Sequence, residues 1–362
     1  MKQDEILNSM KRLSLFLAIA ISALVSTQSI AKSSQENVFF SHGDWELGCD
    51  NTLSCRAAGY TENAMNSENV AVVILSRQAG PATKVENWVL LTNSDSSRNS
   101  KQKSAPEIII NKTSLGPLEK GEDVSWKMNE SQYGAFMAAL SNKGKITFKD
   151  SVDTYTFSSA GSNAVLLKMD EFQGRVGTQG AILSKGDRDE SKVPLPKAVP
   201  VLKKSPVLDA EGQKLSADQL NTFRKQLLPS IVKGKGSDCS EDIEQEEWFA
   251  ARLDAGHTLI YAACWKGAYN VGNLWYIVSP DLKKIIQWVD NSNHTYRDGM
   301  IEGFFLGNSA GVSETKSQFL WNGSQFVDAY EDYRGHCAGY TDFSPCRMPL
   351  LETNHYQAYS VF

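Results

Sequence analysis

Short apolar runs separated by turn-forming residues dominate the hydrophobic pattern of this chain. In the first half, several runs are rich in β-branched and aromatic residues, as in NVAVVILS and NWVLLT. Runs of this length between turn formers predict β-strands. The predicted strands of the first half are 69–76, 87–92, 107–110, 145–148 and 153–157. The segment 164–169 fits either a buried strand or a short helix.

One segment of the first half, 130–141, has helical spacing instead. Asn129 is a suitable cap residue at its start, and Gly144 follows its end. Its apolar stripe consists of Tyr133, Phe136, Met137 and Leu140. Such a stripe is typical of a helix that packs on a core. We therefore predict a β-sandwich with one packed helix for the first half of the chain.

The second half begins with a predicted helix and continues as strands. Ser216 can cap a helix that runs to about Val232, and Pro229 should bend or end it. Asn322-Gly323 lies between two of the predicted strands and is a strong hairpin signal. The predicted strands are 248–253, 257–265, 274–279, 284–289, 300–306, 316–321 and 325–330. We predict an antiparallel β domain led by one helix.

A proline-rich stretch at 184–206 separates these two halves. It contains four prolines and many charges, and it lacks apolar periodicity. Because proline fixes φ and removes a backbone donor, the stretch suits an extended linker. The alternative is a long surface loop inside one domain. The predicted organisation is mainly β, with domains at 36–183 and 207–362.

The first 31 residues have the pattern of a secretory signal. Lys11 and Arg12 precede the apolar run 13–25, and Ser29-Ile30-Ala31 offers a cleavage site. We expect cleavage after Ala31 and a periplasmic or secreted product, with no membrane span after signal removal. Met1 and Met10 both remain candidate starts. An uncleaved N-terminal anchor is the alternative.

Charge and cysteine content agree with an exported globular protein. The net charge of −5 gives no basic face for nucleic acid. Six cysteines in an exported chain predict a disulfide framework. Since short loops close at the smallest entropic cost, we favour three local pairs. The pairs are Cys49 with Cys55, Cys239 with Cys264, and Cys337 with Cys346.

Four segments resemble a known bacterial family. They are GDWELGCDNTLSCRAAGY (43–60), DEFQGRVGTQGAI (170–182), CWKGAYN (264–270) and WNGSQF (321–326). In this order they are similar to the exported proteins of domain-of-unknown-function family 1176, along nearly the whole mature chain. The first half is also similar, more weakly, to invasion-associated locus B proteins. The resemblance implies an exported envelope protein and supplies no activity.

The residues with recognition chemistry form one aromatic group and one basic candidate. Trp265, Tyr269, Asn270 and Trp275 surround glycine turns and suit sugar or peptide binding, because flat rings bury area at low entropic cost. The competing interpretation is that these rings fill the core. Arg175 is a candidate anion contact or an ion-pair partner.

No catalytic or metal-binding constellation is recognisable in the sequence. There is no C-x-x-C motif, no nucleophile elbow and no histidine pair with zinc-binding spacing. We therefore expect no catalytic residues, metal or cofactor. The expected function is a non-catalytic envelope binding or structural protein whose partner is cell-wall glycan or a periplasmic protein. The alternatives are a carboxylate-dependent periplasmic hydrolase and an inhibitor of envelope-attacking enzymes with a protruding loop at 334–347.

Overall fold

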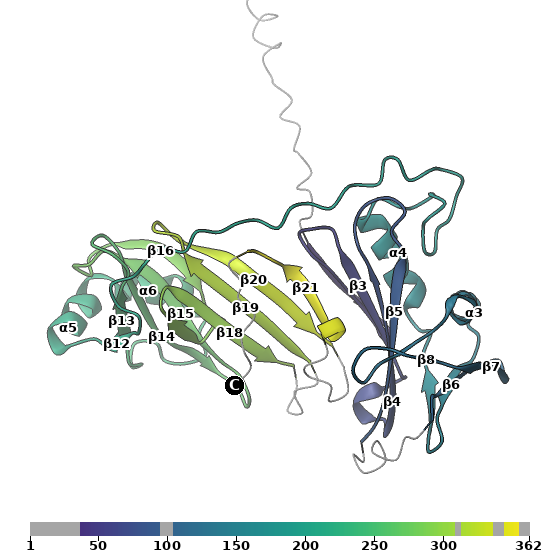
Figure 1. The fold of residues 1–362 in the computed structure, drawn as a ribbon. Coiled ribbons are helices and arrows are strands. Elements are labelled where there is room, and N and C mark those ends of the chain that lie inside the picture. The colour runs from purple at the N-terminus through teal and green to yellow at the C-terminus, as the bar shows by residue number, and fades with distance from the viewer. Residues whose placement is uncertain (1–36, 95–103, 308–312, 336–343, 355–362) are drawn as a thin grey trace, which may run out of the picture. The chain divides into compact units, whose positions relative to one another are not determined.

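The described residues of the computed structural model are 37–94, 104–307, 313–335 and 344–354 (Figure 1). Strands dominate them and form four sheets in which every strand pair is antiparallel. The prediction of a mainly β chain with antiparallel sheets is confirmed. Within these ranges no helix is both long enough and apolar enough to cross a membrane. The predicted signal at 1–31 lies outside them.

Two sheets are built from the first half of the chain. The larger has the strand order β1-β2-β3-β4-β5-β9-β8 and the smaller has the order β11-β10-β6-β7. The larger sheet contains β1 (Val38–His42), β2 (Trp45–Cys49), β3 (Cys55–Tyr60), β4 (Asn69–Arg77), β5 (Val85–Asn93), β8 (Glu119–Lys120) and β9 (Trp126–Lys127). The smaller contains β6 (Glu107–Ile110), β7 (Thr113–Pro117), β10 (Ile146–Lys149) and β11 (Thr154–Phe157). A 3-10 turn, η1 (Ala64–Asn66), precedes β4.

Two helices, not one, pack with these sheets. Helix α3 (Glu130–Ser141) matches the predicted segment, and the Asn129 side chain caps it together with Gln132. The ambiguous segment 164–169 is part of α4 (Ser162–Phe172). Gly161 starts α4 at φ 96°, and a Cβ there would lie 1.7 Å from the His42 carbonyl oxygen. Only glycine permits this close approach. The apolar pattern of 164–169 alone did not indicate that a helix begins at this glycine.

The larger sheet is buried on both faces. One face shares a core with the smaller sheet, α3 and α4, and this core includes Leu75, Phe136, Phe148 and Met169. On the other face, Val72 and Ile74 belong to a separate cluster that also contains Met348. Burial on both sides explains why β4 reads as a continuous apolar run and not as an alternating one.

The second half also forms two sheets, each of five strands. Their orders are β12-β13-β14-β15-β16 and β17-β18-β19-β20-β21. The first contains β12 (Gln213–Lys214), β13 (Phe249–Arg252), β14 (Thr258–Lys266), β15 (Val271–Val278) and β16 (Ile285–Asp290). The second contains β17 (Thr295–Arg297), β18 (Met300–Leu306), β19 (Glu314–Trp321), β20 (Phe326–Arg334) and β21 (Arg347–Leu351). The apolar pattern predicted most of these strands and missed β12, β17 and β21, which have five residues or fewer.

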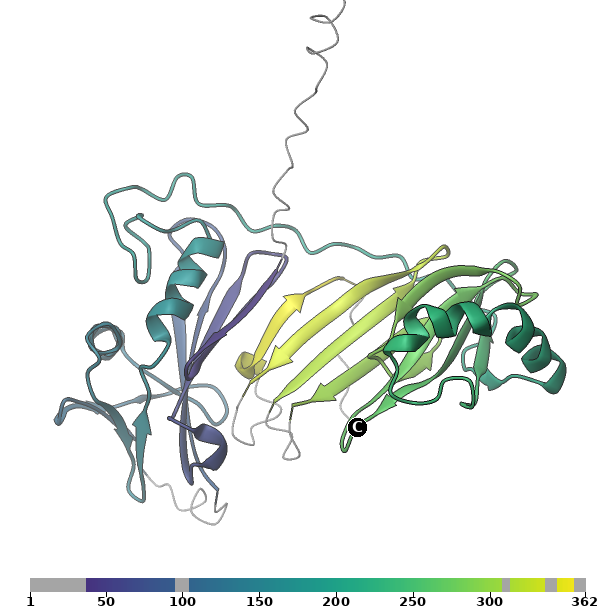
Figure 2. The same ribbon diagram turned by 180° about the vertical axis from the view of Figure 1, so that it is seen from behind.

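These two sheets pack face to face, and helices cover the other face of the first sheet (Figure 2). Trp275 and Ile277 of β15 meet Ile301 and Trp321 of the second sheet in one core. The predicted single helix is two helices, α5 (Ala217–Gln226) and α6 (Leu228–Lys233), with Pro229 in the first turn of α6. Proline is tolerated there and interrupts a longer helix, as the sequence predicted. Two 3-10 turns, η2 (Lys235–Asp238) and η3 (Ser344–Cys346), complete the described elements.

The stretch 184–206 runs without helix or strand and is tied down at several points. The Gly80 N–H donates to the Pro194 carbonyl, and the Lys197 N–H donates to the Thr52 carbonyl. Further along, the Ser205 N–H donates to the Trp321 carbonyl. Bends and turns occur in its first part, 184–193, whereas 194–206 has none. The division into domains at 36–183 and 207–362 stays a prediction.

Candidate functional site

Disulfides brace both halves of the chain. Cys49 and Cys55 face each other in the register of β2 and β3 and are bonded, with their Cα atoms 4.1 Å apart. Cys239, which follows η2, is bonded to Cys264 of β14. Both pairs were predicted and are confirmed. Cys346 is also disulfide-bonded. Its predicted partner, Cys337, lies outside the described residues.

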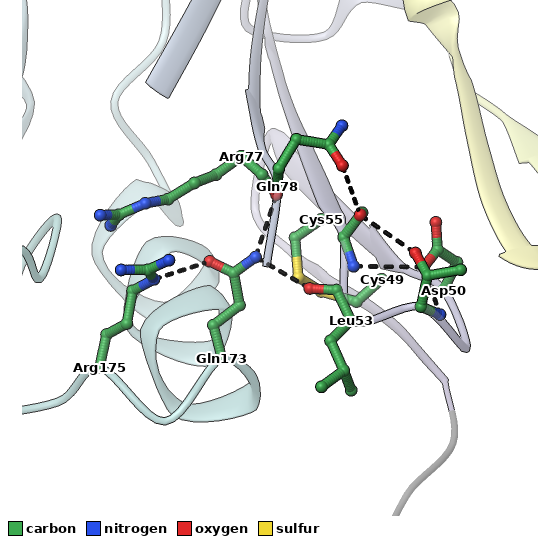
Figure 3. Close-up of a disulfide and its surroundings, with 10 residues drawn as sticks. Cys49, Asp50, Leu53, Cys55, Arg77, Gln78, Gln173 and Arg175 are labelled. Atoms are coloured by element: carbon green, nitrogen blue, oxygen red, sulfur yellow. Dashed lines mark hydrogen bonds between the residues drawn. A yellow bond between two sulfur atoms is a disulfide. The ribbon is translucent and has the colours of Figure 1, made fainter. Parts of the chain in front are cut away.

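Arg175 belongs to a buried hydrogen-bond network, and Gln173 links it to Leu53 and Arg77 near the Cys49–Cys55 disulfide (Figure 3). The side chain of Gln173 donates to the carbonyls of Leu53 and Arg77, each at 3.0 Å, and accepts from Arg175 Nε. The guanidinium also donates to Thr83 Oγ1 at 2.7 Å, to the Gly80 carbonyl and to the Glu190 carboxylate. Arg175 is fully buried, and its guanidinium is occupied by these partners. Of the two roles predicted for it, Arg175 therefore has that of an ion-pair partner and not that of a surface anion contact.

Two carboxylates complete this network. Asp170 accepts from the N–H groups of Ile182 and Leu183, each at 2.9 Å. Burial acts to raise the pKa of Glu190, but hydrogen bonds from the Ala82 N–H and Arg175 outweigh it, and the pKa is lowered. The DEFQGRVGT segment is therefore a structural clamp that holds the start of the 184–206 stretch against the larger sheet.

The predicted aromatic group does not form one exposed surface. Trp275 is buried and stacks on Tyr261 with ring centroids 4.2 Å apart, so it is a core residue. Trp265 is half-buried, whereas Tyr269 is 58% exposed. The Asn270 side chain is occupied, since it bonds both the N–H and the carbonyl of Leu306. The competing interpretation of these rings as core residues applies to Trp275.

These residues instead hold the loop between β16 and β17. Trp265 Nε1 donates to the Asn291 carbonyl and Trp275 Nε1 to the Asn293 carbonyl, each at 2.8 Å. Asn273 donates to the His294 carbonyl at 3.1 Å. The loop is thereby placed next to a cleft on the second sheet of the second half. The aromatic residues thus support a site without forming it.

We name this feature the β18–β20 cleft. Its volume is ≈ 370 Å³. Three groups of side chains line it: the loop residues before β17, the exposed phenylalanines of β18, and residues of β19 to β21. They are Ser292, Asn293, Phe304, Phe305, Thr315, Ser317, Phe319, Asp328, Tyr330, Glu331 and Leu351. Volume and mixed lining suit a small ligand.

A β-bulge brings two carboxylates to the same face of β20. Asp328 and Glu331 are three residues apart and would point to opposite faces of a regular strand. The register shifts here, so that Phe319 faces Asp328 while Ser317 faces Glu331. Ser317 and Phe319 lie two residues apart on β19 and therefore share a face. The extra residue in β20 thus directs both acids into the cleft.

The electrostatics of the cleft are those of unpaired acids. Burial raises the pKa of Glu331, and the charges of Asp328 and Asp332 raise it further. Burial and Asp290 raise the pKa of Asp328, whose side chain is exposed at the cleft. No Lys, Arg or His is among the lining residues of the described chain. Burial lowers the pKa of His294, which packs edge-on against Phe304 and stays neutral near pH 7.

Asn293 places an unsatisfied donor at the cleft. The residue is 2% exposed, and its Oδ1 accepts from the Ser317 hydroxyl. Its Nδ2 has no partner among the described residues. A buried donor without an acceptor costs free energy, which a ligand oxygen can recover. Gly303 permits this arrangement, because a Cβ at that position would lie 2.3 Å from Asn293 Oδ1.

The residues that line the cleft were not among the site residues predicted from the sequence. The sequence signal was present in part, since the adjacent Phe304 and Phe305 cannot both face a core in one strand. Phe304 is 46% exposed and Phe305 is 50% exposed. The β20 bulge and the position of Asn293 arise from long-range pairing. No local pattern predicts them.

Replacing Glu331 by Gln is expected to stabilise the fold at pH 7. The raised pKa means that the folded state binds the Glu331 proton more tightly than the unfolded state. Wild-type stability therefore falls as pH rises through this pKa, and the neutral variant escapes that loss. We expect a gain of about 1 kcal/mol at pH 7 that shrinks towards pH 4. Urea unfolding at both values measures it, with Glu244→Gln at an exposed side chain as control. Lower stability of Glu331→Gln at pH 7 would contradict the unpaired carboxylate.

Comparison with known proteins identifies the family. The family model described as "Protein of unknown function (DUF1176)" matches residues 39–344. The chain belongs to this family, as its sequence motifs predicted. It is also similar to the uncharacterized protein YpfG of Escherichia coli (strain K12), with 27% identity over 261 residues, which is 71% of each chain. No solved structure matches the chain.

Proposed function

We propose that this chain is an exported, non-catalytic binding protein whose site is the β18–β20 cleft and whose ligand is a saccharide, such as a unit of cell-wall glycan. The observation that carries the proposal is the Asn293 amide, buried with an unpartnered N–H in a cleft lined by phenylalanines, hydroxyls and carboxylates. Such a lining provides donors and acceptors beside apolar walls.

A sugar ring matches these groups individually. Its hydroxyl hydrogens can be accepted by Asp328 and Glu331, and its oxygens can accept from Asn293 Nδ2. The exposed ring of Phe305 offers a flat apolar wall for the C–H face of the sugar. An anionic ligand fits poorly, because the lining carries two acids and no base.

Export is supported by the chemistry of the chain. Disulfides persist in oxidising compartments and are rare in the cytosol. Two pairs bond within the described residues. Together with the signal pattern of residues 1–31, they favour a periplasmic or secreted location.

Binding of cell-wall saccharides to the mature protein (residues 32–362) tests this function. We expect calorimetric binding of soluble cell-wall fragments that Phe305→Ala weakens at least about tenfold, while Tyr269→Ala binds as wild type. Tyr269 is a matched control because it is an exposed aromatic outside the cleft. The reverse result would move the site to the aromatic group predicted from sequence. No binding of any fragment would reject the proposal.

A carboxylate-dependent hydrolase is the second candidate. It is favoured by the two acids on one face of β20 and by the raised pKa of Glu331, a feature of general acids. It predicts slow release of shorter saccharides during long incubation, abolished by Glu331→Gln and by Asp328→Asn. If saccharides bind but no shorter saccharide is released, the hydrolase is rejected and the non-catalytic binding function is supported. The inhibitor loop at 334–347 lies largely outside the described residues.

A further inference from the structure

We infer that the group recognised in the β18–β20 cleft is a protonated amine on a hydroxylated ring, as in a de-N-acetylated amino sugar. This inference rests on the proposed function and narrows its ligand class. It follows from three features of the cleft: its uncompensated charge, its exposed aromatic walls and its single unsatisfied donor. Each of these features excludes a different class of ligand.

The negative charge of the cleft favours a cationic ligand. Asp328 and Glu331 enter it from one face of β20, and neither forms an ion pair within the described residues. Neighbouring basic side chains already have acidic partners. Arg347 pairs with Asp332 at 2.7 Å, and Lys316 pairs with Glu314 at 3.0 Å. Two carboxylates on one face without a basic partner gain most from a cationic ligand.

Register separates these basic residues from the cleft. Lys316 pairs with Asp332, in the row between those of Ser317–Glu331 and Thr315–Tyr333. Since successive residues of a strand alternate between faces, Lys316 and Asp332 point to the face opposite Ser317 and Glu331. Lys316 and Arg347 therefore compensate acids other than Asp328 and Glu331. The negative charge inside the cleft remains for the ligand.

The aromatic walls fit an ammonium better than a metal ion. Phe305 lines the cleft on the face of Thr315 and Ser317 and is 50% exposed, and phenyl faces attract ammonium groups. A divalent ion would need converging oxygen ligands. Within the part of the chain that the structure describes, no three His, Cys or acidic residues are arranged to hold one.

The Asn293 donor distinguishes an amino sugar from a simple amine. Its unpartnered Nδ2 needs an acceptor oxygen, which an alkyl polyamine lacks and a ring hydroxyl provides. N-acetylation would remove the positive charge, and a phosphate would oppose the two acids. A sugar with a free amine is the chemistry that satisfies all three features together.

Three disaccharides of similar shape test the inference by calorimetry on the mature protein: glucosamine disaccharide, its di-N-acetylated form, and cellobiose. We expect glucosamine disaccharide to bind at least about tenfold more tightly than either neutral sugar at pH 6. This preference should shrink as salt rises. Asp328→Asn and Glu331→Gln should each reduce it to a few-fold, whereas Glu244→Gln should leave it unchanged. Urea unfolding of every variant confirms that it is folded.

The outcomes separate this inference from the proposed function. Equal or tighter binding of the N-acetylated sugar or cellobiose, still weakened by Phe305→Ala, would overturn the amine and leave the cleft as a saccharide site. An amine preference unaffected by both acid substitutions would also overturn it. Failure of all saccharides, cell-wall fragments included, would reject the proposed function itself.

Discussion

Replacing Glu190 by Gln is expected to lower the free energy of unfolding by about 3–5 kcal/mol, because it leaves a buried charge without its partner. The Arg175 side chain is 0% exposed and Glu190 only 13%. Glu190 also lies 3.6 Å from the Arg77 guanidinium, whose side chain is 4% exposed. Two guanidinium groups therefore share one carboxylate. Urea unfolding at pH 7 measures the loss.

A matched control isolates burial as the cause. Glu171 pairs with Lys168 at 3.5 Å, but this pair is on the surface, with Glu171 49% exposed. Glu171→Gln should therefore change stability by less than about 0.5 kcal/mol. Equal urea midpoints for Glu190→Gln and wild type would show that Arg175 is adequately satisfied by Gln173, Thr83 and the Gly80 carbonyl alone.

The clamp also explains why the 184–206 stretch can be extended without being loose. Its irregular backbone gains no ladder of hydrogen bonds, so its position depends on individual contacts. Glu190 supplies the strongest of these, through Arg175 and the Ala82 N–H. We therefore expect the damage from Glu190→Gln to spread to the Gly80–Pro194 hydrogen bond nearby.

Local patterns predicted the elements well where burial followed a simple period. Helix α3 was correct at both ends, because its cap and its apolar stripe are encoded within one short segment. Strand β18 was also correct at both ends. Helix α4 stayed ambiguous because Val165 and Leu166 are both buried, a pattern shared by strands and helices in a two-sided core.

The candidate site was less predictable, since its geometry depends on pairing between distant residues. Trp275 was a candidate recognition residue because it lies near glycine turns and amide side chains, yet it packs between two sheets and supports the Asn293 backbone. Asp328 and Glu331 became neighbours through a bulge opposite β19. The sequence shows which acidic residues are present, but the strand register determines which of them lie on the same face of the sheet.

Removing the Cys239–Cys264 disulfide should destabilise the protein more than removing Cys49–Cys55. Chain entropy in the unfolded state grows with the loop released, and the two loops have sequence separations of 25 and 6 residues. The loop-entropy relation gives about 3.5 kcal/mol for the longer loop and about 2.4 kcal/mol for the shorter. Paired Cys→Ala variants avoid burying a new hydroxyl, and urea unfolding without reductant compares them with wild type.

Packing in the folded state could reverse the predicted order of destabilisation for the two disulfides. Cys49 and Cys55 are both almost completely buried in the core of the first half, so their loss also removes packed sulfur atoms. Cys264 is buried as well, while Cys239 lies only partly buried at the edge of the core of the second half. If the Cys49–Cys55 variant proves the less stable, packing in the folded state outweighs loop entropy. Reductant opens these two bonds together with that of Cys346, so reduced wild type gives the stability of the chain without disulfides and without any change of side chain.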